Sequence, residues 1–276
     1  MRTKGASFNA SDAVISLTNA DSGIHYGDTK HGAENAWSAV GSMDNDDFRV
    51  AKNEMVTRAD MTFGGAKIGI SLGDDTNISG TEKDYISLGI TGSAGAFSYA
   101  LAHQNENTAT LDPVDNLAAT QLATTGVRVS TTLGGATVAL GYAKNDNGGS
   151  TGIEVSYPMG ALTTTASYVQ AGKDGAENNW DVKFIYDADA VGLTVATDES
   201  QDWNVDVSYE MGNGLSLFVG ADDGGEDTYA GVSYDLGGGA SMLASYANDN
   251  DNDDNDDDVG AKDYKEGMTF QLSFAF

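Results

Sequence analysis

Met268-Thr269-Phe270-Gln271-Leu272-Ser273-Phe274-Ala275-Phe276 is the stretch of sequence that decides the fold class. In it, large apolar residues stand at every second position, and small or polar residues stand between them. A helix would distribute these apolar side chains around its axis, whereas a strand places all of them on one face. The stretch therefore predicts a β-strand with one apolar and one polar face.

The same alternation recurs through most of the chain. Aromatic and branched apolar residues occupy alternate positions, for example, in residues 97–101, 127–133, 180–186 and 203–209. We count about seventeen such segments, most of them within the usual length of barrel strands. The pattern predicts an all-β protein.

Short turns and long loops alternate between these segments. Gly-rich turns follow every second strand, at residues 64–66, 93–95, 134–135, 159–160, 212–214 and 237–239. Glycine suits them because tight hairpins need positive φ angles. Longer polar loops lie between the turns, at residues 75–83, 104–121, 173–179 and 248–266. This alternation predicts an up-and-down meander with all short turns at one end and all long loops at the other.

The composition excludes several classes of protein. The 276 residues are 40% hydrophobic and include 12 Tyr, 9 Phe and 3 Trp, which argues against a disordered chain. Lys and Arg number 14 against 42 Asp and Glu, giving a formal charge of -28. Such a charge excludes nucleic acid as a partner, because phosphate binding needs clustered basic residues, but it fits a cation-attracting pore. No segment approaches the roughly 18 apolar residues of a membrane-spanning helix.

Alternating strands fit both a soluble sandwich and a membrane barrel, and three features favour the barrel. Tyrosines gather near strand ends, where interfacial girdles lie, at Tyr142, Tyr157, Tyr168, Tyr186, Tyr209, Tyr234 and Tyr246. Small residues fill the polar face, as a wide water-filled interior allows, at Gly69, Ser71, Ser87, Gly89, Ser156, Ser167, Ser208 and Ser233. The strand number also exceeds that of ordinary sandwiches. We therefore expect a transmembrane antiparallel up-and-down β-barrel in the outer membrane.

Several motifs give the chain a family resemblance. Tyr234-Asp235-Leu236-Gly237-Gly238-Gly239-Ala240-Ser241 resembles the final hairpin of alphaproteobacterial general-diffusion porins. Phe276 is similar to the aromatic residue that ends their last strand, and residues 23–29 are similar to the strand before their inward-folded constriction loop. The resemblance implies a porin-type barrel of about 16 or more strands that forms homotrimers. It also implies passive diffusion of small hydrophilic solutes, with outer-membrane lipid and lipopolysaccharide as surroundings.

One departure from the family concerns the N-terminal part. About two strands precede the candidate constriction loop, where the family has four or five, and an odd strand total does not close an ordinary bacterial barrel. Residues 1–7 are positively charged but are followed by no apolar signal segment. We therefore expect residues 1–276 to form one barrel domain that lacks some N-terminal strands.

The segment 29–55 breaks the hairpin rhythm, and loops of that length are usually functional or disordered. We expect it to fold into the barrel and narrow the pore, with Asp44, Asp46, Asp47 and Glu54 as its acidic side. By strand parity, Arg58, Lys67, Arg128 and Lys183 face the lumen and supply the basic side. Opposed charges would orient polar solutes and disfavour apolar ones. The alternative is an exposed outer loop with solvated charges.

An acidic run at residues 248–258 suggests Ca²⁺, which prefers oxygen ligands. Asp249, Asp251, Asp253 and Asp254 are weak candidate ligands. Against an EF-hand, Asp254 stands where Gly is needed and Gly260 where Glu is needed. The plainer interpretation is an acidic outer loop, and no cofactor is required.

The sequence carries no catalytic motif among those of common hydrolases, metalloproteases or nucleotide-binding proteins. A hydrolase built on His25 with a nearby Ser and Asp is a minor alternative. The leading expectation is a passive, cation-preferring channel that is not an enzyme. Its rivals are a non-conducting barrel or adhesin whose acidic loops bind partners or Ca²⁺, and a soluble Ca²⁺-dependent β-repeat protein.

Overall fold

The structure is a computed structural model that describes residues 13–43, 46, 48, 55–74, 85–105, 107–108, 120–172, 177–249, 258–259 and 264–275. Within these residues, seventeen strands form an antiparallel sheet, and two further pairs of very short strands stand apart from it. The predicted all-β class is thus confirmed. No described helix is long and apolar enough to cross a membrane.

The chain divides into two compact units, which we describe separately. The first comprises residues 1–133, 138–153 and 169–178. It contains β1 (Val14–Thr18), β2 (Ser22–Gly27), α1 (Gly32–Ala36), β3 (Met55–Phe63), β4 (Ala66–Asp74), β5 (Tyr85–Ala94), β6 (Phe97–Gln104), β7 (Asn107–Thr108), β8 (Thr120–Gln121) and β9 (Thr124–Leu133). Most of β10 (Ala136–Asn145) and parts of β11 (Gly148–Met159) and β12 (Leu162–Ala171) also belong to it.

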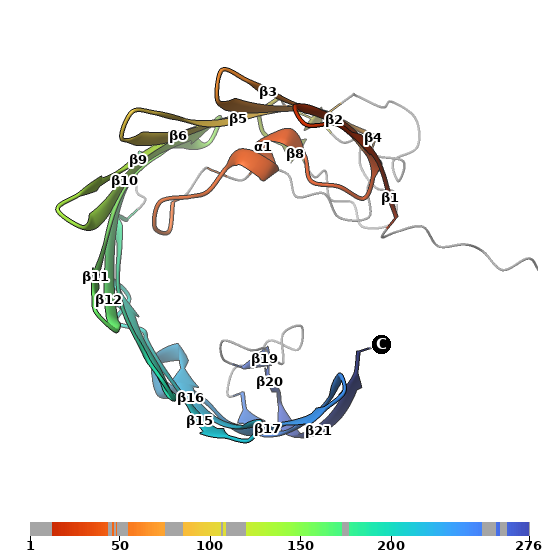
Figure 1. Ribbon diagram of the computed structural model, residues 1–276. Coiled ribbons are helices and arrows are strands. Elements are labelled where there is room, and N and C mark those ends of the chain that lie inside the picture. Colours follow the sequence, from red (N-terminus) through yellow and green to blue (C-terminus); the bar gives the residue numbers. More distant parts are fainter. Residues whose placement is uncertain are drawn as a thin grey trace, which may run out of the picture. The chain divides into compact units, whose positions relative to one another are not determined.

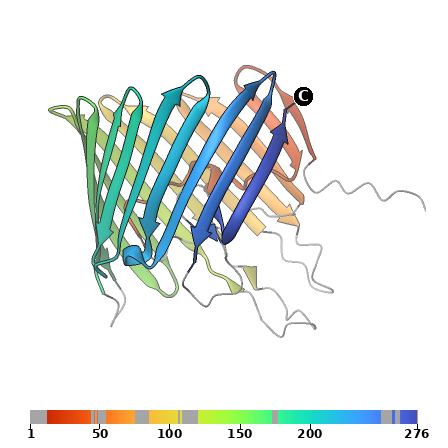
Figure 2. The same cartoon turned by 90° about the horizontal axis from the view of Figure 1, so that it is seen from below.

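The second unit comprises residues 134–137, 154–168 and 179–276. Its strands follow one another as adjacent antiparallel hairpins, drawn from cyan to blue in Figure 2. They are β13 (Asn179–Ala188), β14 (Val191–Asp198), β15 (Trp203–Gly212), β16 (Leu215–Asp222), β17 (Asp227–Gly237), β18 (Ala240–Asn248) and β21 (Gly267–Phe274). The unit also contains the remaining parts of β11 and β12, a 3₁₀ turn, η1 (Asp223–Gly225), and a short hairpin, β19 (Asp258–Val259) with β20 (Tyr264–Lys265).

The register between neighbouring strands gives each unit an apolar and a polar face. In the first unit, Ile70 is opposite Leu88, and the next residue, Ser71, is opposite Ser87. Ile70 is 50% exposed, whereas Ser71 and Ser87 are 0% exposed. We call the side that carries Ile68, Ile70 and Leu72 the apolar face, and the side that carries Gly69, Ser71 and Gly73 the polar face. The same division continues in β15, where Val207 and Ser208 point to opposite faces.

The short turns have the backbone that the sequence predicts. Gly64 and Gly65 join β3 to β4 with φ angles of 59° and 84°. These values lie in the left-handed region that glycine adopts without steric cost. The glycine pattern did not predict the turn between β13 and β14, because there Asp189 supplies the positive φ angle, of 48°. Aspartate tolerates this conformation better than most residues do.

The burial of side chains is the reverse of that in a soluble sandwich. Large apolar residues of the apolar face are exposed, including Phe63, Leu72, Phe270 and Leu272. The buried residues are mostly small or polar, such as Ala102, Ala139, Ser71 and Thr124. A sandwich would cover its large apolar side chains with a second sheet. A protein that leaves them exposed needs an apolar environment around it.

We expect a Lys on the apolar face to destabilise the fold, whereas a Lys at the same depth on the polar face will not. A Val207→Lys protein should lose about 2–4 kcal/mol of unfolding free energy in lipid bilayers, because its charge would enter hydrocarbon. Urea unfolding in vesicles, followed by tryptophan fluorescence, measures the loss. Ser208→Lys is the matched control, and equal destabilisation by both variants would contradict the assignment of the faces.

Candidate functional site

The segment that follows β2 turns back over the polar face of the first unit. Its short helix, α1, contacts β4, β5 and β6. Figure 1 shows the helix and the chain that follows it lying against one side of these strands. The segment belongs to the predicted range 29–55, of which the structure describes residues 29–43, 46, 48 and 55.

Serines of the sheet hold the start of α1. The amide of Gly32 donates to Ser71 Oγ at 2.9 Å, and the amide of Ala33 donates to Ser87 Oγ at 2.7 Å. The first amides of any helix lack partners within the helix, so these hydroxyls replace the water that would otherwise bind there. His31 is 0% exposed, and its ring meets the Tyr85 ring edge-on at 4.7 Å.

Glycines of the sheet allow the segment to approach at backbone distance. A Cβ atom on Gly89 would lie 2.0 Å from the carbonyl oxygen of Gly32. A Cβ atom on Gly126 would lie 2.5 Å from the Trp37 ring. Both distances are far below a van der Waals contact, so any larger residue at either position would push the segment off the sheet.

Beyond α1, apolar contacts continue the attachment. The Trp37 ring lies 5.4 Å from the Phe48 ring, and Trp37 Nε1 donates to Asp46 Oδ2 at 2.9 Å. Val40 and Met43 are buried against Ala139, Ala143 and Val169 of β10 and β12. The segment is therefore packed against the sheet from α1 to Met43.

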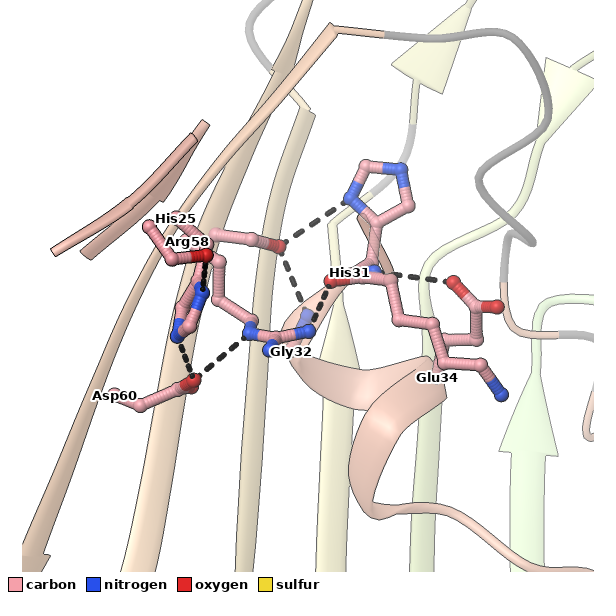
Figure 3. A network of polar contacts seen from close by, with 9 residues as sticks. His25, His31, Gly32, Glu34, Arg58 and Asp60 are labelled. Atoms are coloured by element: carbon pink, nitrogen blue, oxygen red, sulfur yellow. Dashed lines mark hydrogen bonds and ion pairs between the residues drawn. The ribbon is translucent and has the colours of Figure 1, made fainter. Parts of the chain in front are cut away.

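A polar network ties the start of the segment to β1, β2 and β3 (Figure 3). Ser16 Oγ and His25 Nδ1 share a hydrogen bond of 2.8 Å, and His25 Nε2 lies 3.1 Å from Asp60 Oδ2. Arg58 Nε donates to the same oxygen at 3.1 Å, and Arg58 Nη1 donates to the Lys30 carbonyl at 2.7 Å. The buried Arg58 is thus engaged in holding the segment where it leaves β2.

Two cavities border α1. One, of about 260 Å³, is lined by His25, Asn35, Asp60 and Lys67, among others. The other, of about 340 Å³, is lined by Ser38, Lys67 and Arg128, among others. Arg128 Nε is buried and has no hydrogen-bond partner among the described residues. Lys67 and Arg128 therefore present their positive charges beside the segment.

The structure brings some of the predicted charged residues together and leaves others apart. Asp46 lies on the segment, and Arg58, Lys67 and Arg128 belong to the same unit. Lys183 is exposed in β13, in the second unit. Asp44, Asp47 and Glu54 lie outside the described residues, as do Asp251, Asp253 and Asp254.

Metal binding finds no support in the part of the chain that the structure describes. Asp249 is described, but no group of three or more His, Asp or Glu residues with metal-binding spacing occurs there. The Ca²⁺ hypothesis rests on residues outside that part and stays a prediction.

Sequence reasoning missed the residues that hold the segment. Ser71 and Ser87 were recognised only as small residues of the polar face, and His31 and Asp60 were not recognised at all. Alternation indicates which face a residue occupies, but it does not indicate which distant segment will cover that face.

Comparisons with known proteins give one family model and several solved structures to which the chain is similar. A model of a family described as Gram-negative porin matches residues 3–255. An engineered variant of Rhodopseudomonas blastica porin is 14% identical, covers 71% of this chain and 86% of its own, and has a TM-score of 0.46. Another variant of the same porin is 12% identical, with 75% and 90% covered and a TM-score of 0.46. No curated protein sequence matches the chain.

A Gly89→Val protein should release α1 from the sheet, because its side chain would occupy the position of the Gly32 carbonyl. The chain has no cysteine, so the pair Ala33→Cys and Ala102→Cys, which share one buried cluster, can report on docking. We expect efficient oxidative cross-linking in the parent background and at least about a fivefold reduction with Gly89→Val. Ile90→Val, on the apolar face, is the control; unchanged cross-linking in Gly89→Val would refute the proposed steric role.

Proposed function

We propose that this chain, which belongs to the Gram-negative porin family, is a general-diffusion channel whose width is set by the segment 29–55. Porins are outer-membrane β-barrel proteins, so the apolar face of the strands contacts lipid and the polar face contacts water. The channel passes small hydrophilic solutes and ions by diffusion, with no chemical step. Porin membership agrees with a channel rather than an enzyme.

One observation carries this proposal: the segment is packed on the polar face. A segment on the lipid side would expose its amides and charges to hydrocarbon, at a cost of several kcal/mol for each unsatisfied group. On the water side, the same groups bind wall hydroxyls, as the Gly32 and Ala33 amides do. Any chain on that side reduces the cross-section available to solutes.

The charges around the segment suggest how solutes are filtered. Asp46, with Asp44, Asp47 and Glu54 of the same stretch, would form an acidic side, and Lys67 and Arg128 a basic side. Opposed charges in a narrow aqueous path create a transverse field that favours polar solutes. The net charge of -28 gives the whole channel a preference for cations.

The assembly of the protein and its lipid surroundings also belong to the proposed function. By its resemblance to general-diffusion porins, the protein would form a homotrimer in a membrane whose outer leaflet contains lipopolysaccharide. The acidic run at residues 248–258 would bind Ca²⁺ weakly and bridge to anionic lipid. Chemical cross-linking in native membranes tests the trimer.

Planar-bilayer recordings test the function. The purified protein should give ohmic single-channel steps in KCl, and a KCl gradient should give a reversal potential of the sign expected for a cation-preferring pore. Absence of conductance in correctly folded protein would refute the channel and favour the non-conducting barrel or adhesin.

We expect the basic residues beside the segment to lower the preference of the channel for cations. Replacing both Lys67 and Arg128 with Gln should raise the cation-to-anion permeability ratio by about twofold or more, because two positive charges leave the narrow path. Asp46→Asn should lower the ratio. Lys144→Gln, on the opposite parity of β10, is the control and should leave it unchanged. If Lys144→Gln changes the ratio by as much as Lys67→Gln and Arg128→Gln do per charge removed, only bulk surface charge is responsible.

We expect the width of the channel to depend on the docking of α1. Gly89→Val, which should dislodge α1, is expected to increase single-channel conductance because more of the cross-section becomes available to water. Conductance equal to that of the parent protein, despite lost cross-linking, would show that the segment does not set the width.

A further inference from the structure

We propose that the polar face of the second unit carries a binding site for small organic cations with a protonated amine. The site is centred on Asp206 and on the aromatic rings of Tyr229, Tyr264 and Phe218. The site would add selectivity for a class of solute to the proposed channel. It rests on the proposed function because solutes would reach the site through the water of the channel.

Strand register brings the wall of the site together. Asp206 of β15 is opposite Thr194 of β14 on one side and Gly220 of β16 on the other. Gly220 is in turn opposite Tyr229 of β17. Because the side chains of opposed residues share a face, this row runs across four strands of the polar face.

Glycine in this row makes room for an aromatic ring. A Cβ atom on Gly220 would lie 2.5 Å from Cε1 of Tyr229, so the tyrosine ring occupies the space above the glycine. This position lets the Tyr229 hydroxyl donate to Asp206 Oδ1 at 2.5 Å. This contact holds Oδ1 in place, and Asn204 Nδ2 donates to the other oxygen, Oδ2, at 3.3 Å, so both oxygens of the carboxylate are positioned.

The short hairpin of β19 and β20 covers the row. Val259 and Tyr264 pack with Tyr229 and Ala247 in one buried cluster. The Tyr264 ring stacks on the Tyr229 ring with centroids 4.8 Å apart, and it lies 6.5 Å from the Phe218 ring. Tyr264, which lies within the predicted long loop 248–266, is thus only 4% exposed.

The site contains a buried hydroxyl without a partner. Tyr264 Oη makes no hydrogen bond to any described residue, although an unpaired buried polar group costs free energy. Burial, reinforced by the nearby Asp206 carboxylate, raises the pKa of this hydroxyl, so it is neutral at physiological pH. A neutral hydroxyl can accept a hydrogen bond from an ammonium group.

A cavity of about 260 Å³ lies beside these residues. Its lining includes Asp206 and the three aromatic residues, together with Asp187, Thr194 and Ser208. The carboxylates would attract a cation, the hydroxyls would accept its hydrogen bonds, and an aromatic face would attract the positive charge through its quadrupole.

The surrounding charge selects cations. Residues 179–276 contain eighteen Asp and four Glu, 22 acidic residues in all, against the three basic residues Lys183, Lys262 and Lys265. Aromatic rings favour an organic cation over a metal ion, because hard metal ions need several oxygen ligands. The described residues around the cavity offer no group of three metal-binding side chains.

Benzylammonium is a suitable probe because it combines a protonated amine with a small ring. Isothermal titration of the detergent-solubilised full chain at moderate salt should show saturable binding, at least about tenfold tighter than that of the neutral analogue benzyl alcohol. Asp206→Asn, which keeps the shape and one acceptor, should weaken binding about tenfold or more. Tyr264→Phe, which keeps the ring and removes the hydroxyl, should weaken it severalfold.

Two controls test whether weaker binding results from loss of the site, from the general negative charge of the protein or from misfolding. Asp235→Asn, near the end of β17 beside the β17–β18 turn and outside the lining of the cavity, should bind as the parent protein does. Heat-modifiable migration in gels verifies that each variant is folded. Equal affinity for benzylammonium and benzyl alcohol, or no change with Asp206→Asn in folded protein, would overturn the proposal.

Bilayer recordings distinguish this proposal from the proposed function. If the channel conducts but benzylammonium does not bind, the site is wrong and the channel stands. If benzylammonium binds in detergent but KCl conductance is absent, the site stands and the channel is wrong. In a conducting channel, bound benzylammonium should also reduce single-channel current, and this reduction should be lost with Asp206→Asn.

Discussion

Strand register is the constraint on which the rest of this protein depends. Shifting any strand by one residue would exchange its two faces, turning Ile70 toward water and Ser71 toward lipid. The shift would also remove the Ser71 hydroxyl from the amide of Gly32, to which it is bonded at 2.9 Å. The apolar environment around the strands and the segment on their other face therefore specify the same register.

Small residues on the polar face have a second consequence. In a soluble protein, a face of glycine and serine would be poorly packed and weakly stabilising. Here, side chains from other elements fill the space above individual glycines of this face. Trp37 lies over Gly126 in the first unit, and Tyr229 lies over Gly220 in the second. Each glycine marks a place where another side chain approaches the backbone, and both proposed sites are built at such places.

Charge is distributed unevenly along the chain, and the two units differ in their balance of acidic and basic residues. Lys67 and Arg128 stand beside α1 in the first unit, whereas residues 179–276 of the second unit carry only three lysines among 22 acidic residues. Because a charge acts over about a Debye length in salt, roughly 8–10 Å, each site responds mainly to its own neighbours. The segment therefore lies in a field of mixed sign, and Asp206 lies in a predominantly negative one.

The amino-acid sequence by itself determined the strands, their two faces and the tight turns, since alternation and glycine are local signals. Residues 268–274 form the predicted strand, and Gly64 and Gly65 form the predicted turn. Only the tertiary structure decided that Ser71 and Ser87 bind α1, that Arg58 is engaged with Asp60 and the Lys30 carbonyl, and that Tyr264 lies over the row containing Tyr229. The physical reason is that parity fixes the direction of a side chain, whereas the meeting of distant segments depends on strand height, register and the free space left by glycine, which no local pattern encodes.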